Sequence, residues 1–210
     1  LCIHAAESPA ETQWLLDGTG PIADTIYASA GWPITPHSAP GCSPVAYLER
    51  LGALAARPLL VHGVRVSHAD LDLLARRSIP VAHCPRSNAW LGCGRMPYAA
   101  YEQAGVRVAL GTDSLASAPS LSLWDEAAAA YATHRDAGDA VNLATLPRHA
   151  TLDGAVALGV ENDLGTLETG KLAQLACASL SPLSERERAD PHSVLTALLE
   201  GRLRPGPVHG

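Results

Sequence analysis

Side chains that can bind a metal or move a proton recur where the predicted buried strands end. His4 closes a short apolar stub, and Glu7 lies three residues after it. His62 and His83 follow a second and a third apolar run, and Asp113 follows the fourth. Imidazole and carboxylate groups together suit Zn, Fe or Mn, and an open coordination position would hold an activated water. One such residue alone is usually structural, so the recurrence at successive strand ends carries the prediction of a metal site.

The elements that would position these residues alternate between strands and helices. We expect buried strands at residues 1–3, 58–61, 79–82 and 106–110. We expect helices at residues 43–56, 68–77, 97–104, 123–133 and 191–199, with Ser43 and Ser67 as N-caps. Continuous apolar strands that alternate with helices predict an α/β fold with a parallel sheet covered on both faces. The carboxyl ends of such strands form the open mouth where chemistry is placed.

Two regions break this alternation. Residues 17–42 are rich in Gly, Pro and Ser, and we expect an elaborated loop over a site there. Beyond about residue 160 the pattern changes to a turn, Gly165 to Gly170, followed by an apolar strand. This second change indicates that the alternating part of the chain ends near residue 160.

Composition excludes several classes of protein. Of the 210 residues, 47% are hydrophobic and 17% charged, which favours a globular core over disorder. The net charge is −6 without a basic patch, and no run of about 18 apolar residues occurs, so neither nucleic acid nor a membrane is an expected partner. Five Cys without a C-x-x-C pair argue against a disulfide scaffold or zinc knuckle and favour a reduced, cytoplasmic setting.

Five motifs carry a family resemblance. They are, in chain order, His4-Ala-Ala-Glu7-Ser8, Leu60-Val-His62-Gly-Val64, His83-Cys-Pro-Arg-Ser-Asn88, Gly111-Thr-Asp113-Ser114 and Gly165-Thr-Leu-Glu-Thr-Gly170-Lys171. Together they resemble the metal-dependent amidohydrolase superfamily, in its branch of cytosine-deaminase-like aminohydrolases and chlorohydrolases. The resemblance implies the second half of a distorted (β/α)8 barrel over residues 1–160. It also implies a strand segment of a small β domain over 161–182 and a C-terminal helix and tail over 183–210.

The resemblance also implies a role for each matching residue. His4 and Asp113 would bind one divalent metal, Zn first, with Fe or Mn as alternatives. Glu7 would contact the substrate and shuttle protons, His62 would orient or activate the water, and Asp113 would accept the proton of the water. Ser87 and Asn88 would support the site structurally, and His83, which precedes them, would orient or pack against it.

The reaction expected from the resemblance is hydrolytic deamination of an adenosine-like or other aminated heterocycle. Trp32, His37 and Trp90 lie in or beside the strand-end loops and could form a wall for a flat ring. Chloride displacement from a triazine-like ring is the alternative, because it uses the same activated water. The expected partner is therefore a small heterocyclic substrate, and a homodimer is left open.

One departure from the family pattern is large. The family has an His-x-His pair at the end of its first barrel strand, and no His-x-His occurs in this chain. The natural place of that pair lies before residue 1, so we expect either the C-terminal half of a longer protein or a truncated gene. An inactive half-barrel is accordingly a further hypothesis.

Overall fold

The computed structural model describes residues 1–33 and 39–208, and it divides the chain into two compact units. The first unit comprises Leu1–His83 and Asn88–Arg107, and the second comprises Cys84–Ser87 and Val108–Gly210. Within the described ranges, no helix has both the length and the apolar character needed to cross a membrane.

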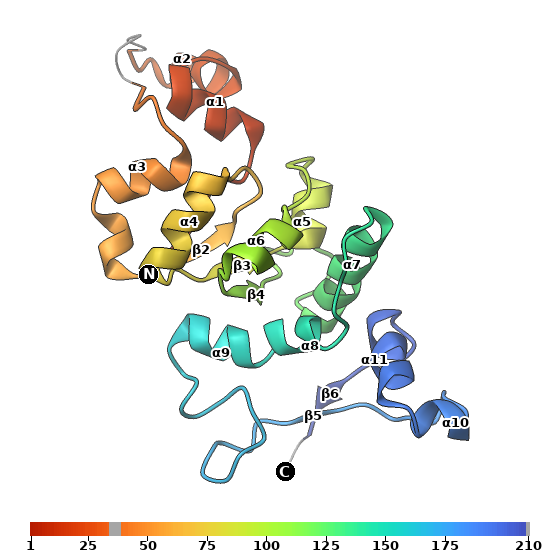
Figure 1. Ribbon diagram of the computed structural model, residues 1–210. Helices are drawn as coiled ribbons and strands as arrows, with labels where there is room; N and C mark the ends of the chain where they lie inside the picture. The colour runs from red at the N-terminus through yellow and green to blue at the C-terminus, as the bar shows by residue number, and fades with distance from the viewer. Residues whose placement is uncertain (34–38, 209–210) are drawn as a thin grey trace. The chain divides into compact units, whose positions relative to one another are not determined.

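The first unit consists of parallel strands with helices between them (Figure 1). Its strands are β1 (Cys2–Ala5), β2 (Leu59–His62) and β3 (Val81–His83). Its helical segments are α1 (Pro9–Asp17), the π-helix η1 (Ile22–Tyr27), α2 (Ala28–Ala30), α3 (Pro44–Arg50), the 3-10 helix η2 (Ala53–Ala56), α4 (His68–Arg77) and α6 (Tyr98–Ala104). Helix α5 (Pro85–Trp90) begins in the second unit and ends in the first.

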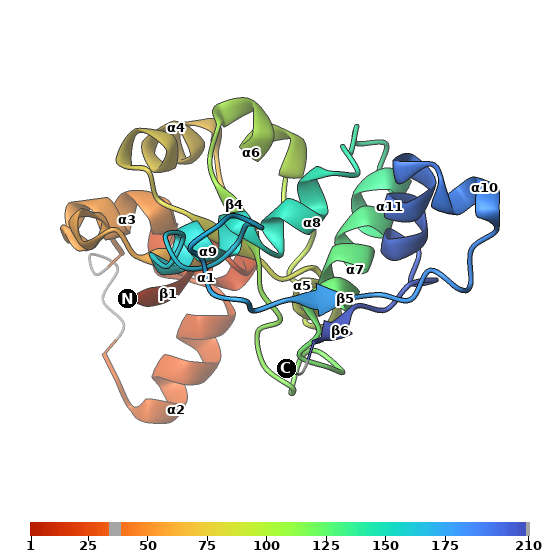
Figure 2. The same cartoon turned by 90° about the horizontal axis from the view of Figure 1, so that it is seen from below.

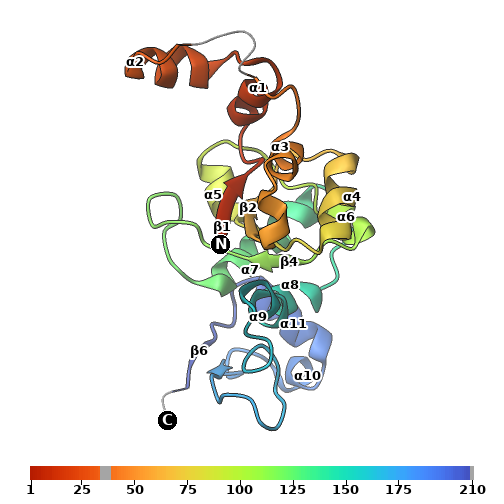
Figure 3. The same cartoon turned by 90° about the vertical axis from the view of Figure 1, so that its left-hand side faces the viewer.

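The strand register brings the carboxyl ends of β1 and β2 to the same edge (Figure 3). Strand β1 pairs in parallel with β2, so that His4 lies opposite Val61 and Ala5 opposite His62. Strand β2 pairs in parallel with β3, and the Val81 amide donates to the Arg107 carbonyl at 2.9 Å. The α/β class with a parallel sheet, predicted from the sequence, is confirmed.

Local sequence signals explain the helices that cover these strands. The Ser67 hydroxyl accepts from the Asp70 amide, and the Asp70 carboxylate accepts from the Ser67 amide, which forms a capping box at the start of α4. Leu71 and Leu74, three residues apart, are buried, and α4 packs beside α6 (Figure 2). The predicted bounds of α4 are therefore confirmed.

The second unit consists of one central strand, β4, packed by helices, with a separate small hairpin. Its elements are β4 (Val108–Leu110), α7 (Leu123–Asp136), α8 (Thr145–His149), α9 (Leu152–Leu158), β5 (Ala176–Cys177), α10 (Glu185–Arg188), α11 (Pro191–Leu199) and β6 (Gly206–Pro207). Leu110, Ala127, Leu146 and Leu199 form one buried apolar cluster, which joins β4 to α7, α8 and α11. Strands β5 and β6 pair in antiparallel fashion (Figure 2).

The structure corrects the predicted elements in two places. The segment 17–42 is not only a loop, because it contains η1 and α2. The helix expected over 43–56 ends at Arg50, and a 3-10 turn replaces its last part. Gly52 adopts a left-handed backbone with φ of 72°, which interrupts the α-helix.

Candidate functional site

The first unit brings three of the predicted residues together at the ends of β1 and β2. The ring centroids of His4 and His62 are 5.1 Å apart with a 31° angle between the planes. The Glu7 Oε1 atom lies 3.6 Å from His62 Nε2. The His62 side chain is 1% exposed and that of Glu7 is 27% exposed, while His4 lies at the surface. A buried imidazole therefore faces a carboxylate that solvent or a ligand can reach.

Asn88 sets the tautomer of His62. Its Oδ1 atom lies 2.8 Å from His62 Nδ1, and both side chains are buried. An amide oxygen only accepts hydrogen bonds, so His62 Nδ1 carries the proton and donates it. His62 Nε2 is then the nitrogen with a lone pair, which is the form that can bind a metal or accept a proton.

The turns that carry these residues have a left-handed backbone at non-glycine positions. The φ angle is 54° at Ala6, 76° at His62 and 57° at Asp113. Such angles cost about 1–2 kcal/mol for residues with a Cβ atom and cluster at functional sites. Gly63 continues the His62 turn, and its carbonyl accepts a hydrogen bond from the buried Tyr101 hydroxyl at 2.8 Å. Tertiary contacts thus hold the strained turn in place.

Glu7 is fixed by residues that the sequence reasoning did not identify. The Glu11 carboxylate accepts hydrogen bonds from the Ala6 amide at 2.9 Å and the Glu7 amide at 2.7 Å. The buried thiol of Cys93 lies 3.6 Å from Glu7 Oε1. The only signal for Glu11 in the sequence was its position four residues after Glu7. Cys93 is 86 positions away from Glu7, so the sequence near Glu7 gave no signal for it.

In the second unit, Asp113 follows β4 and lies between two serine hydroxyls. Its Oδ2 atom is 2.7 Å from Ser87 Oγ and 2.7 Å from Ser117 Oγ. The two hydroxyl oxygens are 2.9 Å apart, and both serines are buried. Ser87 and Asn88 were expected only to support the site, and the structure gives each of them a defined partner.

A buried ion pair anchors the segment that carries Ser87. The Arg86 guanidinium donates to Glu126 at 2.7 Å, to the Ser120 hydroxyl at 3.0 Å and to the Ser120 carbonyl at 2.8 Å. Burial raises the pKa of Glu126, whose side chain is wholly enclosed, and the hydrogen bonds and charge of Arg86 oppose this rise. The pair therefore ties the first residues of α5, which belong to the second unit, to α7.

Two of the three residues predicted to form a substrate wall are exposed tryptophans. Trp32 is 57% exposed and contacts Tyr27 edge-on, with ring centroids 5.2 Å apart. Trp90 is 76% exposed on α5, and His37 lies outside the described residues. His83 is buried at the end of β3. A stacking role for these aromatic groups stays a prediction.

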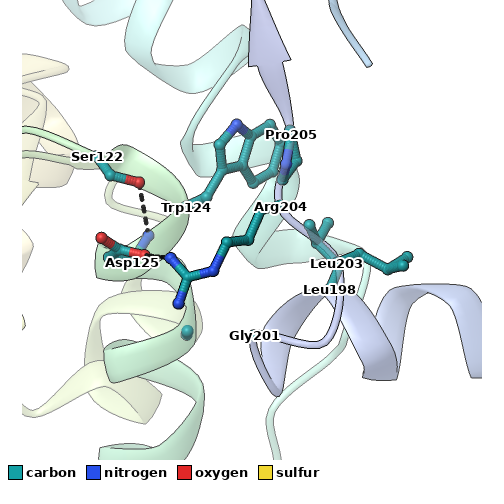
Figure 4. A pocket seen from close by; sticks show the side chains of 9 residues that line it. Ser122, Trp124, Asp125, Leu198, Gly201, Leu203, Arg204 and Pro205 are labelled. Atoms are coloured by element: carbon teal, nitrogen blue, oxygen red, sulfur yellow. Dashed lines mark hydrogen bonds and ion pairs between the residues drawn. The ribbon is translucent and has the colours of Figure 1, made fainter. Parts of the chain in front are cut away.

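A cavity in the second unit is chemically different from the candidate site. It has a volume of about 200 Å³ and is lined by nine residues, among them Trp124, Asp125 and Arg204 (Figure 4). Arg204 extends over Asp125, and the two charged groups lie 3.5 Å apart. None of the predicted site residues lines this cavity, and its charged side chains neutralise each other.

The donor chemistry of the predicted residues fits a divalent cation. His4, His62 and Asp113 each offer one ligand atom, an imidazole nitrogen or a carboxylate oxygen. His62 is held in the tautomer with a bare Nε2, and Asp113 is held by two hydroxyls. Nitrogen and oxygen donors of these types suit Zn²⁺, which commonly binds two or more His with a carboxylate.

Comparisons with known proteins give consistent results. The model of the amidohydrolase family matches residues 1–204. The chain is 42% identical over 135 residues to an aminodeoxyfutalosine deaminase of Deinococcus radiodurans, covering 60% of this chain and 31% of that protein. It is 40% identical over 161 residues to a 5-methylthioadenosine/S-adenosylhomocysteine deaminase of Teredinibacter turnerae, covering 74% and 36%. The chain thus spans about one third of the length of these relatives.

Solved structures show the same likeness. An adenosine deaminase of Xanthomonas campestris with bound zinc is 34% identical with a TM-score of 0.72, covering 94% of this chain and 40% of that one. An atrazine chlorohydrolase of Arthrobacter aurescens complexed with zinc is 26% identical with a TM-score of 0.73, covering 98% and 40%. The predicted partial barrel agrees with this coverage.

Proposed function

This chain belongs to the amidohydrolase family, and from that membership we propose that the protein hydrolyses a non-peptide C–N bond of an aminated heterocycle. The most specific form of the proposal is deamination of an adenosine-like compound. The relatives named above that share about 40% of their matched residues with this chain are deaminases, which supports that form. The observation that carries the proposal is the arrangement of the buried His62. Asn88 binds its Nδ1 atom, and its unprotonated Nε2 atom lies 3.6 Å from the Glu7 carboxylate.

We propose that His4 and Asp113 hold one divalent cation beside His62. Zinc is the first choice because the named deaminase and chlorohydrolase structures contain zinc, and Fe or Mn are alternatives. When bound, such a cation supplies a water whose pKa is lowered toward neutrality. The donors of this chain fit that role, since each of the three residues offers one ligand atom.

The residues of the chain then divide the proton transfers between them. Asp113 takes a proton from the attacking water, and the two serine hydroxyls hold its carboxylate in place. His62 uses Nε2 to orient the water or to stabilise the charge that develops on oxygen. Glu7 delivers a proton to the ring nitrogen and regains one from the new hydroxyl group as the carbonyl forms. The proton that Asp113 took from the water passes to the departing amine, which leaves as ammonia.

We also propose a substrate wall and a domain organisation. Trp32, His37 and Trp90 would stack against or cap a flat ring, and the exposed faces of the two Trp side chains leave them free to do so. Residues 1–160 would form barrel elements and 161–182 a strand segment of a small β domain. A homodimer and a cytoplasmic location belong to the same group of proposals.

Ammonia release tests the proposed reaction. The gene product that contains this sequence, expressed in full and loaded with zinc, should release ammonia from 5-methylthioadenosine, S-adenosylhomocysteine or aminodeoxyfutalosine. Glu7→Gln should lower kcat by at least about 100-fold, because general acid–base catalysis contributes 10²–10⁴-fold. Glu200→Gln, at an exposed position after α11, is the matched control and should leave the rate unchanged.

Product analysis of the same protein distinguishes deamination from the alternative reaction. The likeness to an atrazine chlorohydrolase favours chloride displacement as the second candidate. Chloride release from atrazine without ammonia release from any of the three nucleosides would replace the first proposal by the second. If the zinc-loaded protein releases neither product, both forms of the proposal are wrong.

A further inference from the structure

Two serine hydroxyls occupy one oxygen of the Asp113 carboxylate. Ser87 Oγ and Ser117 Oγ each lie 2.7 Å from Oδ2, and they lie 2.9 Å from each other. Ser87 is 0% exposed and Ser117 is 6% exposed. While Asp113 is ionised, both 2.7 Å contacts are satisfied when each serine donates its hydroxyl proton to Oδ2. A cation that bound Oδ2 would have to displace one of these hydroxyls.

The backbone around each serine is held by hydrogen bonds. Ser87 follows Arg86, whose backbone amide and guanidinium both donate to the buried Glu126, at 3.2 and 2.7 Å. Ser117 belongs to a tight turn in which its own amide donates to the Ser114 carbonyl at 3.1 Å. The hydroxyl pair thus belongs to two hydrogen-bonded segments, one before β4 and one after it.

We propose that Ser87 and Ser117 are positioning residues that direct the cation to Oδ1 of Asp113 and so enforce ligation through one oxygen. A cation binds a carboxylate oxygen at about 2.0–2.2 Å, which requires a lone pair and space that Oδ2 does not offer. Ligation through one oxygen keeps the coordination number low, as Zn²⁺ prefers, and disfavours harder cations such as Mn²⁺ that take more oxygen ligands. This inference rests on the proposed metal site.

Cobalt alone, titrated into the full gene product, tests the inference by its visible spectrum. The absorption of Co²⁺ weakens as its coordination number rises. Replacing both serines, as Ser87→Ala with Ser117→Ala, frees Oδ2 for the metal, so the absorption per bound Co²⁺ should fall. The affinity for Zn²⁺ should fall about 10- to 100-fold, the loss found when groups that orient metal ligands are removed. The preference for Zn²⁺ over Mn²⁺ in a competition titration should fall with it.

Ser114→Ala is the matched control, because Ser114 is an exposed serine of the same loop whose hydroxyl accepts from the Ala116 amide and makes no hydrogen bond with the Asp113 carboxylate. It should leave the spectrum and the preference unchanged. Ser117→Ala alone, which keeps the fully buried Ser87, carries the comparison if the double variant does not fold. Cobalt binding with the same spectrum and preference in all variants would overturn this inference alone. If the unaltered protein binds no Co²⁺, the proposed metal site fails first, and this inference fails with it.

Discussion

Replacing Gly63 by Ala tests whether tertiary packing holds the turn that carries His62. Gly63 has a φ of 55°, and a Cβ atom there would overlap the Tyr101 hydroxyl and lie 3.0 Å from Val81 Cγ1. The Tyr101 hydroxyl donates to the Gly63 carbonyl at 2.8 Å, and Tyr101 is completely buried. The ring therefore cannot turn into solvent to make room for the methyl group.

The expected loss of stability has two parts. The left-handed backbone costs a residue with a Cβ atom about 1–2 kcal/mol. Overpacking against the Tyr101 ring adds about 1–3 kcal/mol, so that Gly63→Ala should lower the free energy of unfolding by about 2–5 kcal/mol. Tyr101→Phe alone should cost about 1–3 kcal/mol, because it leaves the buried Gly63 carbonyl without its donor.

A double variant and a matched control separate the packing cost at position 63 from the backbone cost. Phe lacks the oxygen that the new methyl group would meet, so Gly63→Ala with Tyr101→Phe should cost about 0.5–3 kcal/mol less than the sum of the two single changes. Gly52→Ala is the control, since Gly52 has a φ of 72° with open space around it and should show only the backbone cost. Urea unfolding followed by tryptophan fluorescence measures all four variants. Additivity of the two changes, or equal costs at positions 63 and 52, would refute the packing described around His62.

Three further predictions concern single contacts. Burial raises the pKa of Glu126, so the folded state binds the Glu126 proton more tightly than the unfolded state does. The contribution of Glu126 to the free energy of unfolding is therefore greatest below the ordinary pKa of Glu and declines as pH rises through the raised value. Glu126→Gln should abolish that decline in urea midpoints measured between acid and neutral pH. Hydrogen bonds from the Ser184 hydroxyl and amide lower the pKa of Glu187 to about 2. The contribution of Glu187 to the free energy of unfolding is therefore present above the ordinary pKa of Glu and lost as pH falls toward 2. Ser184→Ala should raise this pKa in an NMR titration, and an unchanged pKa would contradict the assignment. Nitrogen NMR should find His62 protonated on Nδ1, with a mixture of tautomers in Asn88→Ala; a proton on Nε2 in the unaltered chain would contradict the hydrogen bond.

Local signals predicted the elements that begin with a clear cap. Helix α4 begins after Ser67 and α11 begins with Pro191 after Asp190, and both match the expected bounds. These helices are defined by hydrogen bonds within four residues, which a sequence pattern can reveal. The π-helix η1 lies in a Gly- and Pro-rich segment whose composition indicated a loop, and its contacts with α1 are not visible in the sequence.

The candidate site was predictable at the level of residue types and strand ends, but not at the level of partners. His4, Glu7 and His62 meet because β1 and β2 are parallel and in register, as the alternating pattern indicated. The hydrogen bond of His62 to Asn88 joins positions 26 apart and depends on how β2 and α5 pack. The left-handed φ angle at His62 could not be predicted either, because residues other than glycine rarely adopt it and nothing in the sequence marks His62 as an exception.

Buried polar pairs outside the site were also hidden from the sequence. His134 and His149 are buried on α7 and α8, with Nδ1 atoms 3.1 and 2.8 Å from Asp139 and Asp153. The second pair is four residues apart but lies on two helices, because α8 ends at His149 and Asp153 belongs to α9. Nothing in that spacing distinguishes a buried pair from a solvated one, because burial is decided by elements distant in the chain.

Zinc stoichiometry tests the metal site most directly. The full gene product, dialysed against Zn²⁺ and measured by atomic emission, should hold one zinc per chain, and His4→Ala or Asp113→Ala should each release it. His192→Ala, at an exposed position on α11, should keep it. Zinc retained at full stoichiometry after either His4→Ala or Asp113→Ala would show that these residues do not share a cation.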